Sequence, residues 1–556
     1  MQRTSTTTTA ETTTLTRATG RTNLPAPPYP IHPPEPLATL SPRDRALFVR
    51  FGYGPTESVA QTHIHHTFEY WATVTPEAVA VEDGNETITY RELDQRADQL
   101  AARLAASGVR PGDRVALFVR RSIPMVVGLL AALKAGAAYV PQHVDTVPPA
   151  QLQHVIHTAD TRVIMTLATT ADRIPAPDGH VVITLDDLGK TEPTDLIAGR
   201  FTPATPLPPD SPCYVLFTSG STGRPNGVVV THRNICNILL TSPGNLGIQP
   251  GWKVGQILNI AFDMASWEIL GALSHGATLV IRGSDIVETM SRVDVIIATP
   301  TVLSRTVPDR CPRVKVVAVA GEPCPRALAD AWSTVCVFYN ACGPTETTIV
   351  NTMSRHHPTA ARLTIGRPTP NNTVYVLDAD LRPCPIGTVG EMWAGGDCVS
   401  AGYLSNAQLT AERYALDPFL GHGRLMFRTR DLGRWTPDGE LEHFGRTDDQ
   451  VKVRGFRVEL DAVSAILEAV PGCTRAATIK LDDRSLVSFV APADVDPDLA
   501  RMAVSEALPY YCVPETVHIL PELPTTSRGK IDKLALRHLV THQDQLVTSQ
   551  EQGATR

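Results

Sequence analysis

The sequence lacks the features that would suit it to a nucleic acid or a membrane. Its formal net charge is −7, whereas a general nucleic-acid surface needs a basic excess. No apolar run is long enough to span a bilayer, because the best candidate, residues 124–135, is too short and carries Lys134. The N-terminus is polar and Thr-rich, without the apolar stretch of a secretory signal. We therefore expect a cytoplasmic protein with no nucleic-acid and no membrane partner.

The cysteines show no pattern that would indicate a metal site or a disulfide framework. The sequence has ten of them, and no two form a C-x-x-C pair. Several lie within apolar runs, where a free thiol behaves as a small apolar side chain. We expect reduced, mostly buried thiols, as is usual in the cytoplasm.

Length and local pattern divide the chain into parts. A chain of 556 residues exceeds one ordinary domain, and 42% apolar residues suit a substantial core. Residues 1–40 are rich in Thr and Pro and predict a flexible leader. Strands and helices then alternate, which predicts a large α/β domain with parallel-rich sheets over residues 41–445. Residues 446–540 predict a small α+β domain, and residues 541–556 form a polar tail.

Apolar spacing gives the expected elements within these two domains. In the large domain it predicts helices at 89–108 and 126–136, and strands at 114–119, 137–141, 162–167, 181–185 and 213–219. In the small domain it predicts strands at 451–459, 476–481 and 486–491, and helices at 462–470 and 499–509.

A loop rich in glycine and hydroxyl residues follows the strand expected at 213–219. Such a loop can fold its backbone N–H and side-chain OH groups around phosphate oxygens. It is not a Walker loop, because the terminal G-K-[ST] is missing, and a flexible surface loop is the alternative interpretation. The residues of the loop are Thr218, Ser219, Gly220, Ser221, Thr222 and Gly223.

The segment around this loop, YVLFTSGSTGRPNGVVVTH, resembles the phosphate-loop motif of the adenylate-forming superfamily. That superfamily includes nonribosomal peptide synthetase adenylation domains, acyl-CoA and aryl-CoA ligases, and luciferases. Eight further matches follow the superfamily's order: ITYREL, LKAGAAYVP, AFDMASWE, NACGPTETT, GEMWAGGDCVSAGYL, FRTRDLGRW, GRTDDQVKVRGFRVEL and LPTTSRGKID. The chain is most similar to freestanding adenylation domains. The resemblance implies a large N-terminal domain and a small, mobile C-terminal domain.

The resemblance also implies roles for single residues. Thr218, Ser219 and Thr222 would hold the ATP phosphates, with the glycines of the loop beside them. Glu346 would ligate Mg²⁺, a hard cation that prefers carboxylate oxygen. Gly343, Pro344 and Thr345 belong to the same adenine-and-magnesium motif.

Ribose binding and catalysis are assigned in the same way. Asp431 would accept hydrogen bonds from the ribose hydroxyls, and Arg446 would contact the ribose region. Asp448 would be the hinge between the domains. Lys530 would be catalytic, stabilising charge as the carboxylate attacks the α-phosphate; Glu346 and Thr218 complete the catalytic set.

Asp263 indicates the substrate, because the matching aspartate in amino-acid-activating relatives pairs with the α-ammonium group. The other positions that align with the specificity pocket are uncharged and favour a large apolar side chain through area burial. The set is similar to phenylalanine-activating pockets; leucine and tryptophan stay open, and tyrosine would bury its OH without a partner. The set is Met264, Trp267, Ile297, Ala318, Ala320, Ala341, Ile349 and Val350.

The expected reaction is ATP-dependent formation of an aminoacyl-AMP, with ATP and Mg²⁺ as cofactors. No L-G-G-x-S carrier motif follows Lys530, so we expect transfer to the phosphopantetheine thiol of a separate peptidyl carrier protein. A small MbtH-like activator protein is a further candidate partner. Two alternatives stay open: an acyl- or aryl-CoA ligase, against which Asp263 argues, and a catalytically silent nucleotide-binding relative.

Two residues depart from the superfamily's pattern within nucleotide-facing motifs. Asn226 stands where the phosphate loop usually has lysine, and Arg430 stands where the ribose motif usually has glycine. A positive φ at that position would strain an arginine. We expect Arg430 to supply the phosphate-directed charge that Asn226 lacks; neutral drift at both positions is the alternative interpretation.

Overall fold

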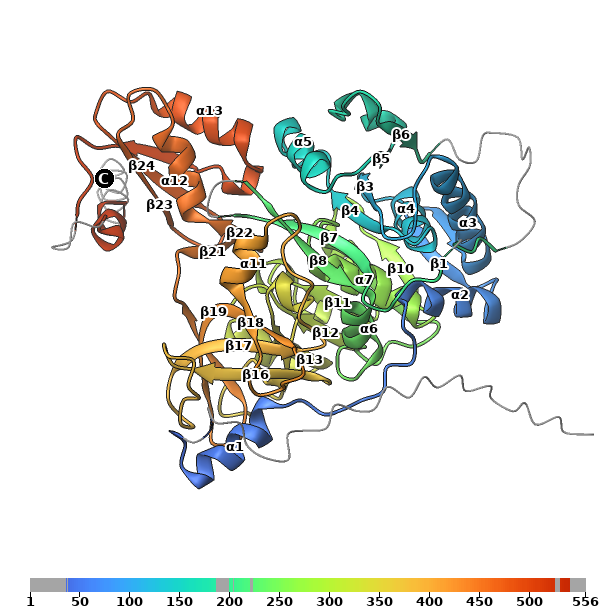
Figure 1. Ribbon diagram of the computed structural model, residues 1–556, viewed down its shortest axis with the longest axis horizontal. Helices are drawn as coiled ribbons and strands as arrows, with labels where there is room; N and C mark the ends of the chain where they lie inside the picture. The colour runs from blue at the N-terminus through green and yellow to red at the C-terminus, as the bar shows by residue number, and fades with distance from the viewer. Residues whose placement is uncertain are drawn as a thin grey trace, which may run out of the picture.

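The computed structural model describes residues 37, 39–186, 200–203, 205–220, 224–525 and 531–540. Its fold is the mixed α/β architecture expected, with large parallel-rich sheets and a smaller C-terminal unit. In Figure 1 this unit, with α12 (Leu460–Glu468), α13 (Pro497–Ala507), β23 (Arg475–Lys480) and β24 (Leu486–Ala491), occupies one corner of the molecule.

Two large sheets form the body of the protein. The six-stranded sheet runs in the order β6 (Val181–Thr184), β5 (Val163–Thr166), β3 (Arg114–Phe118), β4 (Ala138–Gln142), β7 (Pro212–Thr218) and β8 (Asn226–Thr231). All its pairs are parallel except β7–β8. The expected strands therefore form, and the phosphate loop lies between the last two.

The nine-stranded sheet carries the candidate substrate positions. It runs in the order β15 (Arg367–Pro368), β14 (Thr352–His356), β13 (Val337–Cys342), β12 (Val316–Val319), β11 (Val295–Ala298), β9 (Lys253–Gln256), β10 (Thr278–Ile281), β1 (Val79–Asp83) and β2 (Glu86–Thr89). Its central strands, from β13 to β1, are parallel. Their carboxyl ends therefore meet at one edge, where α/β proteins place ligands.

Helices pack between these sheets. The predicted helices form as α3 (Tyr90–Ala106), which begins at a Thr89–Glu92 capping box, and α4 (Ile123–Lys134), which is buried along nearly its whole length. The side chain of Lys134 is fully buried and ion-pairs with Glu69, Asp94 and Asp98 at 2.7–3.1 Å. Three carboxylates around one ammonium group compensate its burial and tie α4 to α2 (Ile64–Val74) and α3.

A third sheet lies beside the body of the protein. It contains β16 (Asn372–Leu377), β17 (Gly390–Gly396), β19 (Leu425–Trp435), β18 (Tyr414–Leu416) and β20 (Leu441–Arg446). Helix α1 (Pro42–Gly52) packs on it, with Phe48 stacked on Tyr375. Figure 1 shows this sheet directly beneath the C-terminal unit.

The C-terminal unit differs from the expectation at residues 451–459, where a single strand was predicted. These residues form a hairpin, β21 (Gln450–Val453) and β22 (Phe456–Glu459). The two residues between the strands, Arg454 and Gly455, have φ values of +52° and +84°. Positive φ at both central residues is typical of the turn that matches the twist of a two-residue hairpin. The other strands, with β25 (Thr516–Ile519), form a three-stranded sheet.

The structure also bears on two expectations from the sequence, reduced cysteines and the lack of a membrane-spanning segment. All ten cysteines are free, and six of them are buried. Among the described helices, none combines the length and apolarity needed to cross a membrane.

A cluster of four histidines lies where α2 meets α6 (His232–Leu240). The rings of His63, His65, His66 and His232 have centroids 4.5–6.0 Å apart. Burial lowers the pKa of His65 and of His232 well below the ordinary value, and the neighbouring histidines lower both further. Glu69, Lys134 and Arg200 are the charged side chains that face the cluster.

We predict that acid destabilises the protein through His65 and His232. Their pKa values are lower in the folded state than in the unfolded state. Their full contribution to the free energy of unfolding is therefore present above pH 6.5 and is lost as the pH falls below that value. The free energy of unfolding should decrease by up to about 1.4 kcal/mol per pH unit for each group. Urea denaturation between pH 5 and 8 measures this slope.

The His65→Gln/His232→Gln double variant should show a shallower slope, whereas His357→Gln, which changes an exposed histidine, should not. Equal slopes in the wild type and the double variant would contradict the assignment.

Candidate active site

A cavity of about 480 Å³ lies where the nine-stranded sheet, the third sheet and the β21–β22 hairpin meet. It brings together most of the residues predicted to bind adenosine, although they are far apart in sequence. Those that line it are Gly343, Pro344, Thr345, Asp431 and Arg446, and beside them lie the predicted substrate residue Ala341 and the predicted hinge residue Asp448. The lining also includes basic and imidazole side chains that were not predicted from the sequence: His443, Lys452, Arg457 and Lys480.

The phosphate loop enters this region from β7. Thr218 ends that strand, and the hydroxyl of Ser219 donates to the main-chain oxygen of Arg457 at 2.9 Å. Gly220 has no room for a side chain, since a Cβ there would lie 2.4 Å from the carbonyl oxygen of Arg224. Ser221, Thr222 and Gly223 lie outside the described residues.

Glu346 is fully buried and has a cation already beside it. It lies in the 3₁₀ turn η4 (Thr345–Thr347). Arg457 Nη1 lies 3.0 and 3.2 Å from the two carboxylate oxygens, and the Tyr403 hydroxyl donates to Oε1 at 2.6 Å. Burial alone would raise the pKa of Glu346, but Arg457 and Arg413 lower it to about 2. The carboxylate is therefore ionised at any working pH.

The hairpin supplies a second cation on the same face. Lys452 on β21 is the direct cross-strand partner of Arg457 on β22. Burial lowers the pKa of Lys452, and the nearby Asp263 carboxylate opposes that effect. Like charges directly opposite each other destabilise a strand pair. Here each cation faces a buried carboxylate of the N-terminal domain.

The ribose-binding pair forms across two strands. Asp431 on β19 is the register partner of Arg446 on β20, and Arg446 Nη1 donates to Asp431 Oδ1 at 2.8 Å. His443 Nε2 lies 3.4 Å from the same oxygen. Burial would raise the pKa of Asp431, but the hydrogen bond to His443 and the charge of Arg446 bring it below the ordinary value.

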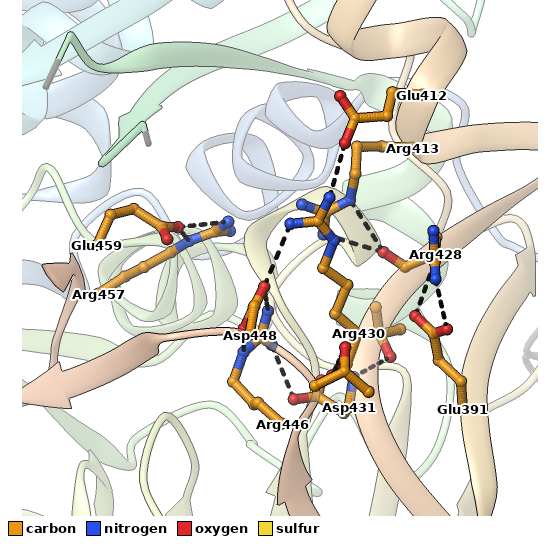
Figure 2. Close-up of polar contacts among 12 residues, drawn as sticks. Glu391, Glu412, Arg413, Arg428, Arg430, Asp431, Arg446, Asp448, Arg457 and Glu459 are labelled. Atoms are coloured by element: carbon orange, nitrogen blue, oxygen red, sulfur yellow. Dashed lines mark hydrogen bonds and ion pairs between the residues drawn. The ribbon is translucent and has the colours of Figure 1, made fainter. Parts of the chain in front are cut away.

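Asp448 is held in turn by Arg446. Figure 2 shows Arg446 between the two carboxylates, Asp431 on one side and Asp448 on the other. Its Nε and Nη2 atoms donate to Asp448 at 2.7 and 3.0 Å. One guanidinium group therefore links the predicted ribose ligand to the predicted hinge.

Asp263 begins α7 (Asp263–Ser274) and is buried next to Thr345, which lines the nucleotide cavity. Its carboxylate accepts a hydrogen bond from Thr345 Oγ1 at 2.8 Å, and burial raises its pKa. The charge of Lys452 opposes this rise, but burial is the larger effect, so a cation such as a substrate ammonium group would stabilise the carboxylate.

The residues predicted to line the substrate pocket are all buried in one apolar cluster around Asp263. Ile297 on β11 and Ala318 on β12 are register partners, and the indole N–H of Trp267 donates to the oxygen of Gly244 at 2.7 Å. The other members are Met264, Ala320, Ala341, Ile349 and Val350.

The prediction that Arg430 supplies the phosphate-directed charge missing at Asn226 is wrong for the orientation seen here. Asn226 Oδ1 accepts a hydrogen bond from Asn406 at 3.1 Å. Arg430 instead pairs with Glu412 at 2.7 Å and with Asp448 at 3.5 Å (Figure 2). Its φ is +62°, so the expected backbone strain is present. Lys530 lies outside the described residues.

Comparison with known proteins gives consistent matches. Residues 68–404 match the family described as AMP-binding enzyme. An adenylate-forming reductase of Coprinopsis cinerea is 46% identical over 509 residues, which are 90% of this chain and 49% of that protein. The isonitrile lipopeptide synthase of Mycobacterium tuberculosis is 38% identical over 83% of this chain and 19% of the synthase.

Solved structures show the same fold. An artificially fused adenylation–PCP didomain from Klebsiella oxytoca, NpsA-ThdA, superposes with a TM-score of 0.73 and 26% identity. The match covers 84% of this chain and 94% of that one. The chain spans about half the length of the reductase and about a fifth of the synthase.

We predict that the two buried tyrosines behind Glu346 differ in their contribution to stability. The Tyr403 hydroxyl donates to the ionised Glu346, whereas the Tyr414 hydroxyl bonds to the neutral Ser400 at 2.7 Å. Tyr403→Phe should therefore cost about 1.5–3 kcal/mol and the matched Tyr414→Phe about 0.5–1.5 kcal/mol. Chemical denaturation of both variants measures the difference; equal costs would show that the charge of Glu346 does not strengthen the bond.

Proposed function

Because the chain belongs to the AMP-binding enzyme family of adenylate-forming proteins, we propose that it activates an amino acid with ATP as an aminoacyl adenylate. The observation that carries the proposal is Asp263, a buried carboxylate bonded to Thr345 at the edge of the nucleotide cavity and adjacent in sequence to Met264 of the apolar cluster. A charged group in such surroundings needs a cation, and the α-ammonium of an amino acid supplies one. An acyl- or aryl-CoA ligase has no use for that carboxylate.

In the proposed reaction, a carboxylate oxygen of the amino acid attacks the α-phosphorus of ATP. The bond from the α-phosphorus to the bridging oxygen breaks, and pyrophosphate leaves. Thr218 and Ser219 would hold the phosphates, while Asp431 and Arg446 would hold the ribose. Lys530 would stabilise the charge that develops on the α-phosphate. Most of the acceleration would come from positioning and charge stabilisation.

Glu346 fits the magnesium ion that this chemistry uses. An ionised carboxylate oxygen is the ligand that a hard cation prefers, and Mg²⁺ would supply charge neutralisation on the phosphates. Arg457 occupies that carboxylate in the orientation seen here, so it would have to withdraw first. We infer that the C-terminal unit moves between the half-reactions.

The proposed substrate is phenylalanine or another large apolar amino acid. Three of the predicted pocket positions, Ala318, Ala320 and Ala341, carry small side chains, which would suit a bulky substrate, and no charged side chain among the predicted positions would demand a polar partner. Burial of a phenyl ring against this lining favours phenylalanine by apolar area alone.

A second cavity supports transfer of the acyl group to a thiol on an anionic arm. It measures about 550 Å³ and lies between the N-terminal domain and the turn of the β21–β22 hairpin. Among the described residues, no carboxylate lines it, whereas five arginines do: Arg121, Arg282, Arg305, Arg454 and Arg484. The Nε atom of Arg282 is buried without a partner. A phosphopantetheine arm brings a phosphate that suits guanidinium groups.

The acceptor in this proposal is a peptidyl carrier protein. The adenylation–PCP didomain that shares the fold supports it. The acyl thioester could then be passed on by the carrier protein or reduced. The similarity to an adenylate-forming reductase supports reduction as the second candidate.

We predict ATP–pyrophosphate exchange that depends on an amino acid and is strongest with phenylalanine. A panel of twenty amino acids, with benzoate and 3-phenylpropionate as acids that lack the amino group, measures it. Asp263→Ala should lower kcat/KM for phenylalanine by about 100-fold or more, the cost of about 3 kcal/mol expected when a buried ion pair loses one member.

Ser266→Ala, a conservative change on the same helix, should keep the amino-acid preference. Exchange confined to acids without an amino group, or an unchanged preference in Asp263→Ala, would refute the substrate assignment.

We predict that the arginine-lined cavity recognises the phosphate of the acceptor arm. Thioester formation should be at least tenfold faster with 4′-phosphopantetheine than with pantetheine at equal, subsaturating concentration. In Arg282→Ser/Arg305→Ser this preference should fall below threefold, while Arg382→Ser, a change at an exposed ion pair elsewhere, should keep it. A preference that survives in the double variant would place the arm elsewhere.

A further inference from the structure

The C-terminal unit joins the rest of the protein through a very short connector. Strand β20 belongs to the third sheet, and β21 pairs only with β22 of the C-terminal unit. Residues 447–449 are therefore all that separates the two. Whatever fixes this segment also fixes the orientation of the hairpin that carries Arg457 and Lys452.

Arg430 fixes the connector at two consecutive residues. Its carbonyl oxygen accepts hydrogen bonds from the main-chain N–H and the hydroxyl of Thr447, at 2.9 and 3.2 Å. Its guanidinium group reaches Asp448 Oδ2 at 3.5 Å with Nη1 and Glu412 Oε1 at 2.7 Å with Nη2. In Figure 2 it extends between these two carboxylates.

The position of Arg430 carries a conformational cost. Its φ of +62° lies in the left-handed region, which glycine adopts freely and an arginine does not. Strained residues persist where the surrounding contacts hold them, and they concentrate at functional positions. The two ion pairs are the contacts that glycine at this position would not make.

Arg430 links the connector to helix α11 (Ala407–Arg413), because Glu412, its second ion-pair partner, belongs to that helix. The side chain of Glu412 is 53% exposed, that of Arg430 28% and that of Asp448 19%, so water screens the outer pair more than the inner one. Arg413 and Arg446 also face Asp448, so Arg430 adds to an existing cationic environment around the connector.

We propose that Arg430 is a positioning residue that clamps the connector and thereby holds the C-terminal unit in the orientation in which Arg457 occupies Glu346. It sets how often the unit leaves that orientation. The consequence for catalysis rests on the function proposed above: the clamp slows the return to the adenylate-forming orientation after each acyl transfer.

Hydrogen–deuterium exchange of the free protein tests the clamp without any substrate. The readout is the exchange rate of the peptide that covers residues 444–452, compared with a peptide from β3. The variants are Arg430→Gly, which removes both ion pairs, and Glu412→Gln, which removes the outer pair and leaves the backbone of residue 430 unchanged. Arg382→Gln breaks an exposed ion pair of 2.8 Å and is the matched control.

We expect at least fivefold faster exchange of residues 444–452 in Arg430→Gly, a smaller increase in Glu412→Gln, and none in Arg382→Gln. Sodium chloride at about 1 M should accelerate this exchange more in the wild type than in Arg430→Gly, because salt screens ion pairs and the variant has lost both pairs of residue 430 while it keeps the Arg446–Asp448 pair. Exchange equal to the wild type in both Arg430→Gly and Glu412→Gln would overturn the proposal. Glu412 lies on the surface, so its variant gives a result even if Arg430→Gly fails to fold.

The kinetic readout separates this inference from the proposed function. If connector exchange rises as expected but no amino acid supports pyrophosphate exchange, the clamp stands and the proposed activity fails. If the enzyme is active, Arg430→Gly should raise the rate of the return step and leave the KM for ATP within twofold of the wild type. A changed KM for ATP with unchanged connector exchange would instead make Arg430 a nucleotide-site residue and overturn the clamp.

Discussion

The ion pair between Glu346 and Arg457 is the constraint on which the rest of the site depends. Glu346 has no exposure to solvent, so its charge must be balanced wherever the C-terminal unit lies. Leaving a buried carboxylate without a cation costs about 3–5 kcal/mol, which is a large share of the stability of a domain. In this orientation the balance comes from a residue 111 positions along the chain. In the orientation that forms the adenylate, the proposed source is a metal ion.

The same logic extends to the whole hairpin. Lys452 and Arg457 lie opposite each other on β21 and β22, where two cations repel. Their mutual repulsion is offset by the carboxylates of Asp263 and Glu346, and for Arg457 also by Glu459 on the same hairpin at 3.3 Å. The hairpin is therefore held in the site by two carboxylates, Asp263 and Glu346. The proposed amino acid and metal ion would neutralise the same two charges. In the proposed function, the amino acid and the metal would compete with Lys452 and Arg457, which would couple substrate binding to the position of the C-terminal unit through charge.

Much of the fold could be predicted from the sequence, because local signals were strong. Apolar spacing over residues 89–108 and the apolar run of α4 predicted helices close to those found, and the apolar strands around β7 formed as expected. The hairpin at 451–459 could not be predicted from apolar spacing, because its turn depends on a positive φ at Arg454 as well as at Gly455. That arginine carries no turn signal of the Asn-Gly type.

The site was only partly predictable, for a related reason. Motif resemblance predicted ribose-binding roles for Asp431 and Arg446 and a hinge role for Asp448. In the structure all three line one cavity. It did not anticipate Arg457 and Lys452, whose partners come from distant parts of the chain. The only sign of them in the sequence was that Lys452 and Arg457 are charged residues alternating with apolar ones in a short segment. Arg430 was assigned to the phosphates because its motif faces the nucleotide, but two carboxylates near the connector attract it more directly.

The most direct measurement is a crystal structure of the protein with Mg²⁺ and a non-hydrolysable ATP analogue. The account predicts a magnesium ion within coordination distance of Glu346 and an Arg457 side chain withdrawn from it, with the ribose on Asp431. A structure in which the analogue and the metal bind while Arg457 stays paired with Glu346 would contradict the claim that the two cations exchange at one carboxylate.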